Sequence, residues 1–256
     1  MVGGPILWTG KVRGMDYWLR ARLTQAELID HWEGRARRLS EKWGWPQAWL
    51  AEFKEYLNDP RLTQEEFWVI YTLERMAAQD RIESVKSEDD ALAFYRDCPY
   101  SLWRQLVHRR HATWRTVLVT MRLRRGVLVE FGGGIGSVIR YVQRRKRDWR
   151  FVLMDVPSAH WDYGLWRTRS TDHIEFSPDV MTAFDVLEHL DDPLSDIQGL
   201  VAHLKFGGYL HWNFVAHESR HDLDLATPEQ RQETMHFLRT DLRTIWERPG
   251  HIVSQK

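Results

Sequence analysis

The residues best suited to chemistry begin with a glycine-rich turn at positions 130–136, EFGGGIG, which directly follows the apolar residues 127–129. Glycine tolerates positive φ and lets a ligand approach the backbone closely. The apolar-periodic segment 135–142 predicts a helix after the turn, whose amides and dipole face any ligand bound there. We therefore expect a ligand-binding turn, and plain chain reversal is the alternative.

A second candidate is the carboxylate of Asp155, which ends the apolar run 151–154. It stands about 20 residues beyond the glycines, where an open α/β sheet places the acid that binds a ribose diol. Its two oxygens can accept hydrogen bonds from both hydroxyl groups. The glycine turn and Asp155 together predict a nucleoside site.

A third group follows the apolar segment 179–183 and comprises Phe184, Asp185, Glu188 and His189. Residues at the carboxyl end of a parallel strand line the ligand crevice of an open sheet. His189 could take a proton from a reacting oxygen or nitrogen, because histidine changes charge near neutral pH. The alternative is that Glu188 and His189 only orient the local structure.

A fourth pattern, His217-Glu218-Ser219-Arg220-His221, matches the H-E-x-x-H signature of zinc proteases. That signature normally lies in an apolar helix, whereas Asp222 and Asp224 follow here and predict a solvated loop. We expect no metal site and assign His217 and His221 to substrate binding. A metal site without proteolysis is the alternative.

These residues need an α/β scaffold to bring them together. The pattern predicts strands at 127–131, 151–155, 173–176, 179–184 and 208–212, with helices after the first two and from Pro228. Residues 242–246 could form a helix or a strand, and Ile252-Val253 could begin an edge strand. We expect an open sheet of about five to seven strands.

Four of these segments, in this order, resemble the class I S-adenosylmethionine-dependent methyltransferases. The resemblance is carried by residues 130–136, Asp155, 182–193 and 204–212, with Phe206 where proline is usual. It implies a Rossmann-like fold and an S-adenosylmethionine (SAM) site. The residues it assigns to that site are Glu130, Gly132, Gly133, Gly134, Gly136, Asp155, Phe184 and Asp185. The short connection before residue 179 leaves Glu175 or Asp179 as candidates for the adenine contact.

The first 15 residues predict an irregular lead-in, and the following segment predicts helices without strands. Serine or threonine followed by an acid marks helix starts at Thr24, Thr63 and Ser87, and Pro46 and Ser101 open two more. We therefore expect an all-α N-terminal domain at 1–115 and a SAM-binding domain at 116–256. In the family resembled, such helices cover the acceptor pocket or pair subunits, so a homodimer could form. They could also simply complete the fold.

The composition limits the classes of binding partner that we expect. The chain has 36 Lys plus Arg residues and 36 Asp plus Glu residues, so its net charge is zero. No overall positive charge therefore indicates a nucleic-acid or membrane partner. The single cysteine, Cys98, excludes an internal disulfide and suits the cytoplasm. Seven arginines and no acid lie between Trp103 and Gly126, and arginine clusters can bind an anionic acceptor.

The function we predict is transfer of a methyl group from SAM to an oxygen, nitrogen or carbon of a small molecule, with Glu188 and His189 as catalytic candidates. One alternative within the same fold is a cyclase or lyase that releases methylthioadenosine. Another is a binding subunit without activity, in which tryptophan side chains fill the acceptor pocket.

Overall fold

The computed structural model describes residues 9–12, 15–18, 38, 41–42, 49–60, 62–98, 100–107, 123–214, 223–248 and 251–256. The statements below concern these residues. Most of the helix predicted from Thr24, the H-E-x-x-H motif at 217–221 and most of the arginine-rich segment lie outside them.

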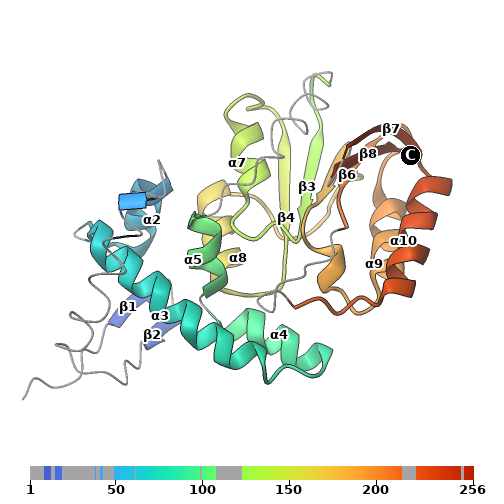
Figure 1. The fold of residues 1–256 in the computed structure, drawn as a ribbon. Coiled ribbons are helices and arrows are strands. Elements are labelled where there is room, and N and C mark those ends of the chain that lie inside the picture. Colours follow the sequence, from blue (N-terminus) through green and yellow to red (C-terminus); the bar gives the residue numbers. More distant parts are fainter. Residues whose placement is uncertain are drawn as a thin grey trace, which may run out of the picture.

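A six-stranded sheet forms the centre of the described structure, in the order β4-β3-β5-β6-β8-β7 (Figure 1). Its strands are β3 (Val127–Phe131), β4 (Arg150–Met154), β5 (Val180–Ala183), β6 (Tyr209–Trp212), β7 (Arg243–Arg248) and β8 (His251–Gln255). The first four are parallel, and β8 runs antiparallel to both of its neighbours. Strands β3 and β5 read as apolar runs because helices cover both of their faces.

Four helices cover the two faces of this sheet (Figure 1). They are α7 (Ser137–Gln143), α8 (Ala159–Thr168), α9 (Pro193–His203) and α10 (Pro228–Thr240). Leu128 and Leu153 pack with Val138 and Ile139 of α7 on one face. On the other face a second cluster contains Val129, Met181, Ile197 and Leu238, which joins α9 and α10 to the sheet. The arrangement is the predicted Rossmann-like α/β fold.

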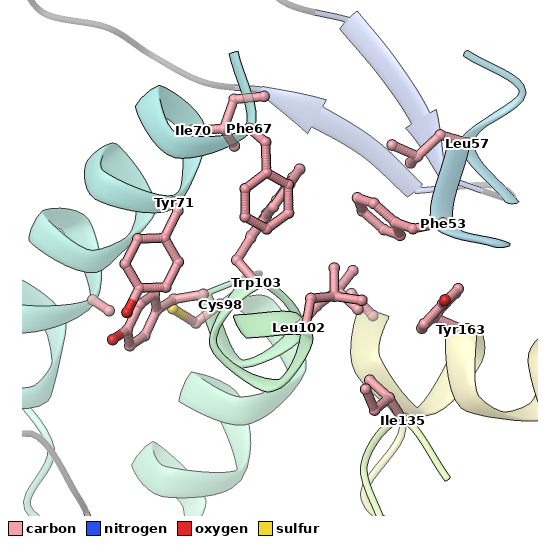
Figure 2. Packing of buried hydrophobic residues seen from close by; sticks show 14 of the residues in the cluster. Phe53, Leu57, Phe67, Ile70, Tyr71, Cys98, Leu102, Trp103, Ile135 and Tyr163 are labelled. Atoms are coloured by element: carbon pink, nitrogen blue, oxygen red, sulfur yellow. The ribbon is translucent and has the colours of Figure 1, made fainter. Parts of the chain in front are cut away.

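The N-terminal helices share one apolar core with the sheet region. They are α2 (Trp49–Leu57), α3 (Gln64–Ile82), α4 (Glu88–Asp97) and α5 (Tyr100–Val107). Figure 2 shows Phe53 of α2 and Leu102 of α5 near Tyr163 of α8 and Ile135 of the glycine turn. The rings of Phe53 and Tyr163 meet edge to face at 5.5 Å between centroids. The predicted helical region therefore packs directly on the glycine turn and α8.

Three local predictions are wrong. Strands β1 (Thr9–Val12) and β2 (Met15–Trp18) form an antiparallel hairpin where we expected an irregular lead-in and then helices. Residues 173–176 form no strand, and the isolated bridge to β4 lies before them, between Thr171 and Val152. Strand β8 is no edge strand, since it lies between β6 and β7.

Within the described ranges, no helix combines the length and apolar character that crossing a bilayer requires. The Cys98 thiol is buried in the helical core, and burial raises its pKa to about 11. A thiol with so high a pKa is almost fully protonated at neutral pH and is therefore a poor nucleophile.

The buried carboxyl group of Glu74 on α3 should make stability depend on pH. Burial raises its pKa to about 7 against the lowering effect of Arg81, and only 8% of the residue is exposed. Between pH 4.5 and 7 the folded state binds more protons than the unfolded state, so the free energy of unfolding falls as pH rises. The Glu74→Gln variant should remove up to about 3 kcal/mol of this loss. Urea unfolding at pH 5 and pH 8 measures it.

The matched control is Glu83→Gln, at an exposed position just after the same helix. This control should keep the pH dependence of the wild type. Equal pH dependence in Glu74→Gln and the wild type would contradict the prediction.

Candidate cofactor and acceptor site

The glycine turn joins the end of β3 to the start of α7 in a backbone conformation that suits glycine. Gly132 and Gly134 have φ values of 59° and 55°, and Gly136, the N-cap of α7, has 67°. A Cβ on Gly132 would collide with the side chain of Val186, and one on Gly134 with the side-chain amide of Gln105. A Cβ on Gly133 would meet Glu130. The turn is thus a tightly packed cradle, and any larger residue in it would clash with neighbouring side chains.

Glu130 supports this turn from inside the protein. The residue is 2% exposed. Its Oε1 accepts a hydrogen bond from the Val138 amide at 3.1 Å and its Oε2 accepts one from the Ile139 amide at 2.8 Å. Both oxygens therefore cap the first turn of α7, and the residue acts on a ligand through the shape of the loop.

Asp155 lies beside the same turn, immediately after β4. Its Oδ2 accepts a hydrogen bond from the Gly134 amide at 2.6 Å, and its Oδ1 accepts one from the Val156 amide at 2.7 Å. Burial alone would raise the pKa of this carboxyl group, but His160 and the two amides outweigh burial and lower the pKa. The group is therefore ionised at neutral pH, and its remaining lone pairs can accept hydrogen bonds from hydroxyl groups.

A reciprocal pair joins the ends of the next two strands. The Asp185 amide donates to Asn213 Oδ1 at 2.6 Å, and Asn213 Nδ2 donates to Asp185 Oδ1 at 2.5 Å. Asp185 has a φ of 48°. The sequence analysis missed Asn213, although its position directly after β6 matches that of Asp185 after β5. Phe184 is 3% exposed and packs edge to face on His211, so it contributes a buried wall.

His189 lies in the short 3₁₀ helix η1 (Leu187–His189) that follows β5. Its Nδ1 is 2.5 Å from the carbonyl oxygen of Leu223 and 3.7 Å from Oδ1 of Asp224. A carbonyl oxygen only accepts, so Nδ1 carries the proton and Nε2 is the basic nitrogen of the neutral ring. The ring also lies 6.0 Å from that of Tyr95 on α4, between centroids. The helical region, through Tyr95, therefore lies beside His189.

Glu188, the other catalytic candidate, is fully buried. Its backbone carbonyl accepts hydrogen bonds from the amides of Leu225 and Ala226 at 2.9 and 3.1 Å. These bonds attach the segment after residue 222 to η1. Glu188 is thus buried, whereas the His189 ring lies beside Leu223 and Tyr95.

The helical region also contributes Gln105, on α5, which the sequence analysis missed. Its Oε1 accepts a hydrogen bond from the Ile135 amide at 2.9 Å. The carbonyl of Ile135 accepts from Nη1 of Arg167, on α8, at 3.2 Å. The backbone N–H and C=O of Ile135 are thus both held by side chains, which fixes the turn from two sides.

Arg167 belongs to an ion-pair network that joins α2, α7 and α8. Glu52 of α2 bonds both Arg140 and Arg167, whose Nε lies 2.9 Å from Glu52 Oε2. A groove of about 810 Å³ lies beside this network and includes Trp149 and Phe151 at the start of β4. Because Arg167 and Thr168 also line it, the groove extends along α8 from the start of β4.

Asp179, one adenine candidate, directly precedes β5. Its Oδ2 accepts from the Val127 amide at 2.8 Å, and both of its oxygens pair with Lys205 Nζ at 2.8 Å. Because Val127 begins β3 and Asp179 precedes β5, this carboxylate lies at the amino-terminal ends of the strands, whereas the glycine turn lies at their carboxyl ends. The prediction of an adenine contact for Asp179 is wrong. Glu175 pairs with the exposed His173.

The glycine turn, Asp155, the Asp185–Asn213 pair and His189 all meet at the carboxyl ends of parallel strands, which is where open sheets bind ligands. A sequence model of the methyltransferase domain family matches residues 102–253. The chain belongs to this family. It is a SAM-dependent methyltransferase, and the match begins within α5, upstream of the boundary predicted at residue 115.

Solved structures of other methyltransferases have the same fold. An O-methyltransferase family protein from Burkholderia thailandensis is 13% identical with a TM-score of 0.53, covering 90% of this chain and 87% of that one. A Nostoc punctiforme protein classed with the O-methyltransferases is 10% identical with a TM-score of 0.50, covering 90% and 97%. No curated protein sequence matches the methyltransferase. At these identities the structures show the fold alone.

The residues present fit SAM. The turn carries no side chain at Gly132, Gly133, Gly134 or Gly136, which allows a ligand to approach its backbone closely. The ionised Asp155 supplies acceptors for a ribose diol beside it. The glycine turn and Asp155 therefore have positions compatible with the cofactor.

Proposed function

We propose that this methyltransferase methylates an oxygen or nitrogen atom of a small molecule bound between η1, α4 and the segment after β6. The observation that carries the proposal is the position of His189, whose ring lies between Tyr95 of α4 and the backbone at Leu223, beside the end of β5. A basic ring nitrogen at the carboxyl ends of the strands favours an acceptor whose reacting atom loses a proton during methyl transfer.

The cofactor site is formed by Gly132, Gly133, Gly134 and Gly136 as the cradle and Asp155 as the ribose acceptor. SAM supplies an activated methyl group on a sulfonium centre. Asp185 and Asn213 hold each other and so keep the ends of β5 and β6 in register beside the cradle. A rigid edge of this kind favours catalysis by alignment, which supplies most of the acceleration when the donor is already activated.

In this proposal His189 receives the acceptor proton on Nε2. The resulting imidazolium keeps its Nδ1 hydrogen bond to the Leu223 carbonyl, and Asp224 at 3.7 Å stabilises the positive charge. Glu188 shapes this site from beneath. His217 and His221 remain candidates for substrate contact, in the segment that follows β6.

A role in cytoplasmic small-molecule biosynthesis accords with the neutral composition and the single reduced cysteine. We further propose a helical unit at 1–115 that covers the acceptor, with a homodimer as a further option, and a SAM-binding unit at 116–256. An anionic acceptor would suit the arginines between Trp103 and Gly126.

The function is tested by calorimetric titration with SAM and S-adenosylhomocysteine, followed by incubation with methyl-labelled SAM and a panel of phenols, amines and carboxylic acids. Binding of both ligands and label transfer to a phenol or amine are the expected results. Release of methylthioadenosine would instead indicate cyclase or lyase chemistry. No binding of either ligand would leave only a binding-subunit role for the fold.

The His189→Ala variant should slow label transfer by about a hundredfold while S-adenosylhomocysteine binds with unchanged affinity, because the base acts on the acceptor. Single-turnover transfer to the best acceptor from the panel measures the rate, and calorimetry measures the affinity. The control is His203→Ala, at an exposed position of α9. Wild-type turnover in His189→Ala would remove the base from the mechanism.

A further inference from the structure

We propose that Gln105 of α5 binds the carboxylate at the amino-acid end of the cofactor, an inference that rests on the proposed cofactor site. Its side-chain amide lies against Gly134, at the position that a Cβ on this glycine would occupy. The helical region thus contributes a direct cofactor ligand as well as a cover.

The orientation of this amide is fixed by its oxygen. The Ile135 N–H donates to Gln105 Oε1 at 2.9 Å, and Gln105 is partly buried on the buried helix α5. Because Oε1 is held by the loop, Nε2 is held next to the loop as well. In the described part of the chain Nε2 makes no hydrogen bond to protein, so both of its N–H donors can serve a ligand.

The dipole of α7 favours an anion at those donors, whereas the charged groups Glu130 and Asp155 beside the turn are themselves carboxylates. The N-terminal end of α7 directs its dipole toward the turn, and the Glu130 carboxylate already caps that helix. The Asp155 carboxylate bonds the Gly134 amide and is an acceptor. The turn therefore has hydrogen-bond donors from Gln105 and acceptors from Asp155.

A SAM molecule has matching ends. Its ribose diol needs acceptors, which Asp155 supplies, and its α-carboxylate needs donors, which Gln105 Nε2 supplies. The two side chains would thus set the direction in which the cofactor lies across the turn. A merely structural Gln105 would need only its oxygen on Ile135, and it would influence every ligand of the turn alike.

The test compares S-adenosylhomocysteine with methylthioadenosine, which has the same nucleoside but no amino-acid carboxylate. Calorimetry is performed on the full-length wild type, Gln105→Ala and Gln105→Glu. The Gln105→Ala variant should bind S-adenosylhomocysteine about tenfold more weakly and methylthioadenosine within about twofold of the wild type. The Gln105→Glu variant should be weaker still for S-adenosylhomocysteine alone, because its carboxylate repels that of the ligand.

Two controls separate this inference from the proposed function. The Asp155→Asn variant should weaken both ligands, and Gln198→Ala, at an exposed position of α9, should change neither. Failure of the wild type to bind either ligand would remove the cofactor site itself. Equal weakening of both ligands by Gln105→Ala, or tighter binding of S-adenosylhomocysteine, would overturn the role of Gln105 while leaving that site in place.

Discussion

The Gly134→Val variant is expected to lose binding of S-adenosylhomocysteine by more than about a hundredfold while remaining folded. Gly134 has a φ of 55°, where a β-branched residue costs about 1–3 kcal/mol. Relief of this strain would move the Gly134 amide, which donates to Asp155 at 2.6 Å. The new side chain would also displace the Gln105 amide. Calorimetry measures the binding, and circular dichroism checks the fold.

Gly199 on α9 provides the matched control, because a Cβ there would meet no heavy atom within 4 Å. The Gly199→Val variant should bind S-adenosylhomocysteine as the wild type does. If folded Gly134→Val retained wild-type affinity, the cofactor would have to bind away from the glycine turn.

The Glu52→Gln variant should lower the free energy of unfolding by about 3 kcal/mol at pH 7, because it leaves the guanidinium of Arg167 without its charged partner. The Arg167 side chain is 1% exposed, whereas that of Glu52 is 20% exposed. Urea unfolding monitored by tryptophan fluorescence measures the loss. The control is Glu55→Gln, an exposed acid on the same helix that also lines the groove.

The pH dependence of this network has a defined sign. Burial alone would raise the pKa of Glu52, but the hydrogen bond of Arg140 and the charges of both arginines lower it below 4.5. The stabilisation is therefore present above the ordinary carboxyl range and disappears as pH falls through the folded-state pKa. Glu52→Gln should lose this acid dependence. Unfolding curves that coincide with those of the wild type at pH 7 would show that Glu52 contributes nothing to stability.

Local sequence patterns predicted where the glycine turn and Asp155 lie in the fold. The apolar run 127–131, the glycines and Asp155 are close in the chain, and each has a strong local preference that packing reinforces. Their places at the ends of β3 and β4 confirm the predicted Rossmann-like order. The start of α4 after Ser87 was also predictable, because its hydroxyl accepts from the Asp90 amide.

Residues that meet only through tertiary packing were not predictable in this way. Gln105 lies on a helix with an ordinary amphipathic pattern, and nothing around it indicates contact with a turn 30 positions later. Glu52 presents the same difficulty, because its arginine partners lie 88 and 115 positions later. The hairpin β1–β2 was missed because strand pairing depends on a partner segment as much as on the residues themselves.

The peptide of Ile135 belongs to the ligand turn and to the helical core at once. Its side chain is fully buried among α2, α5 and α8, while its N–H and C=O are held by Gln105 and Arg167. A ligand on the turn would therefore add its binding free energy to the stability of both proposed units, about 2.7 kcal/mol at a hundred times Kd. Cofactor binding and folding are thus thermodynamically linked, so a mutation in the helical core that destabilises the folded state lowers cofactor occupancy.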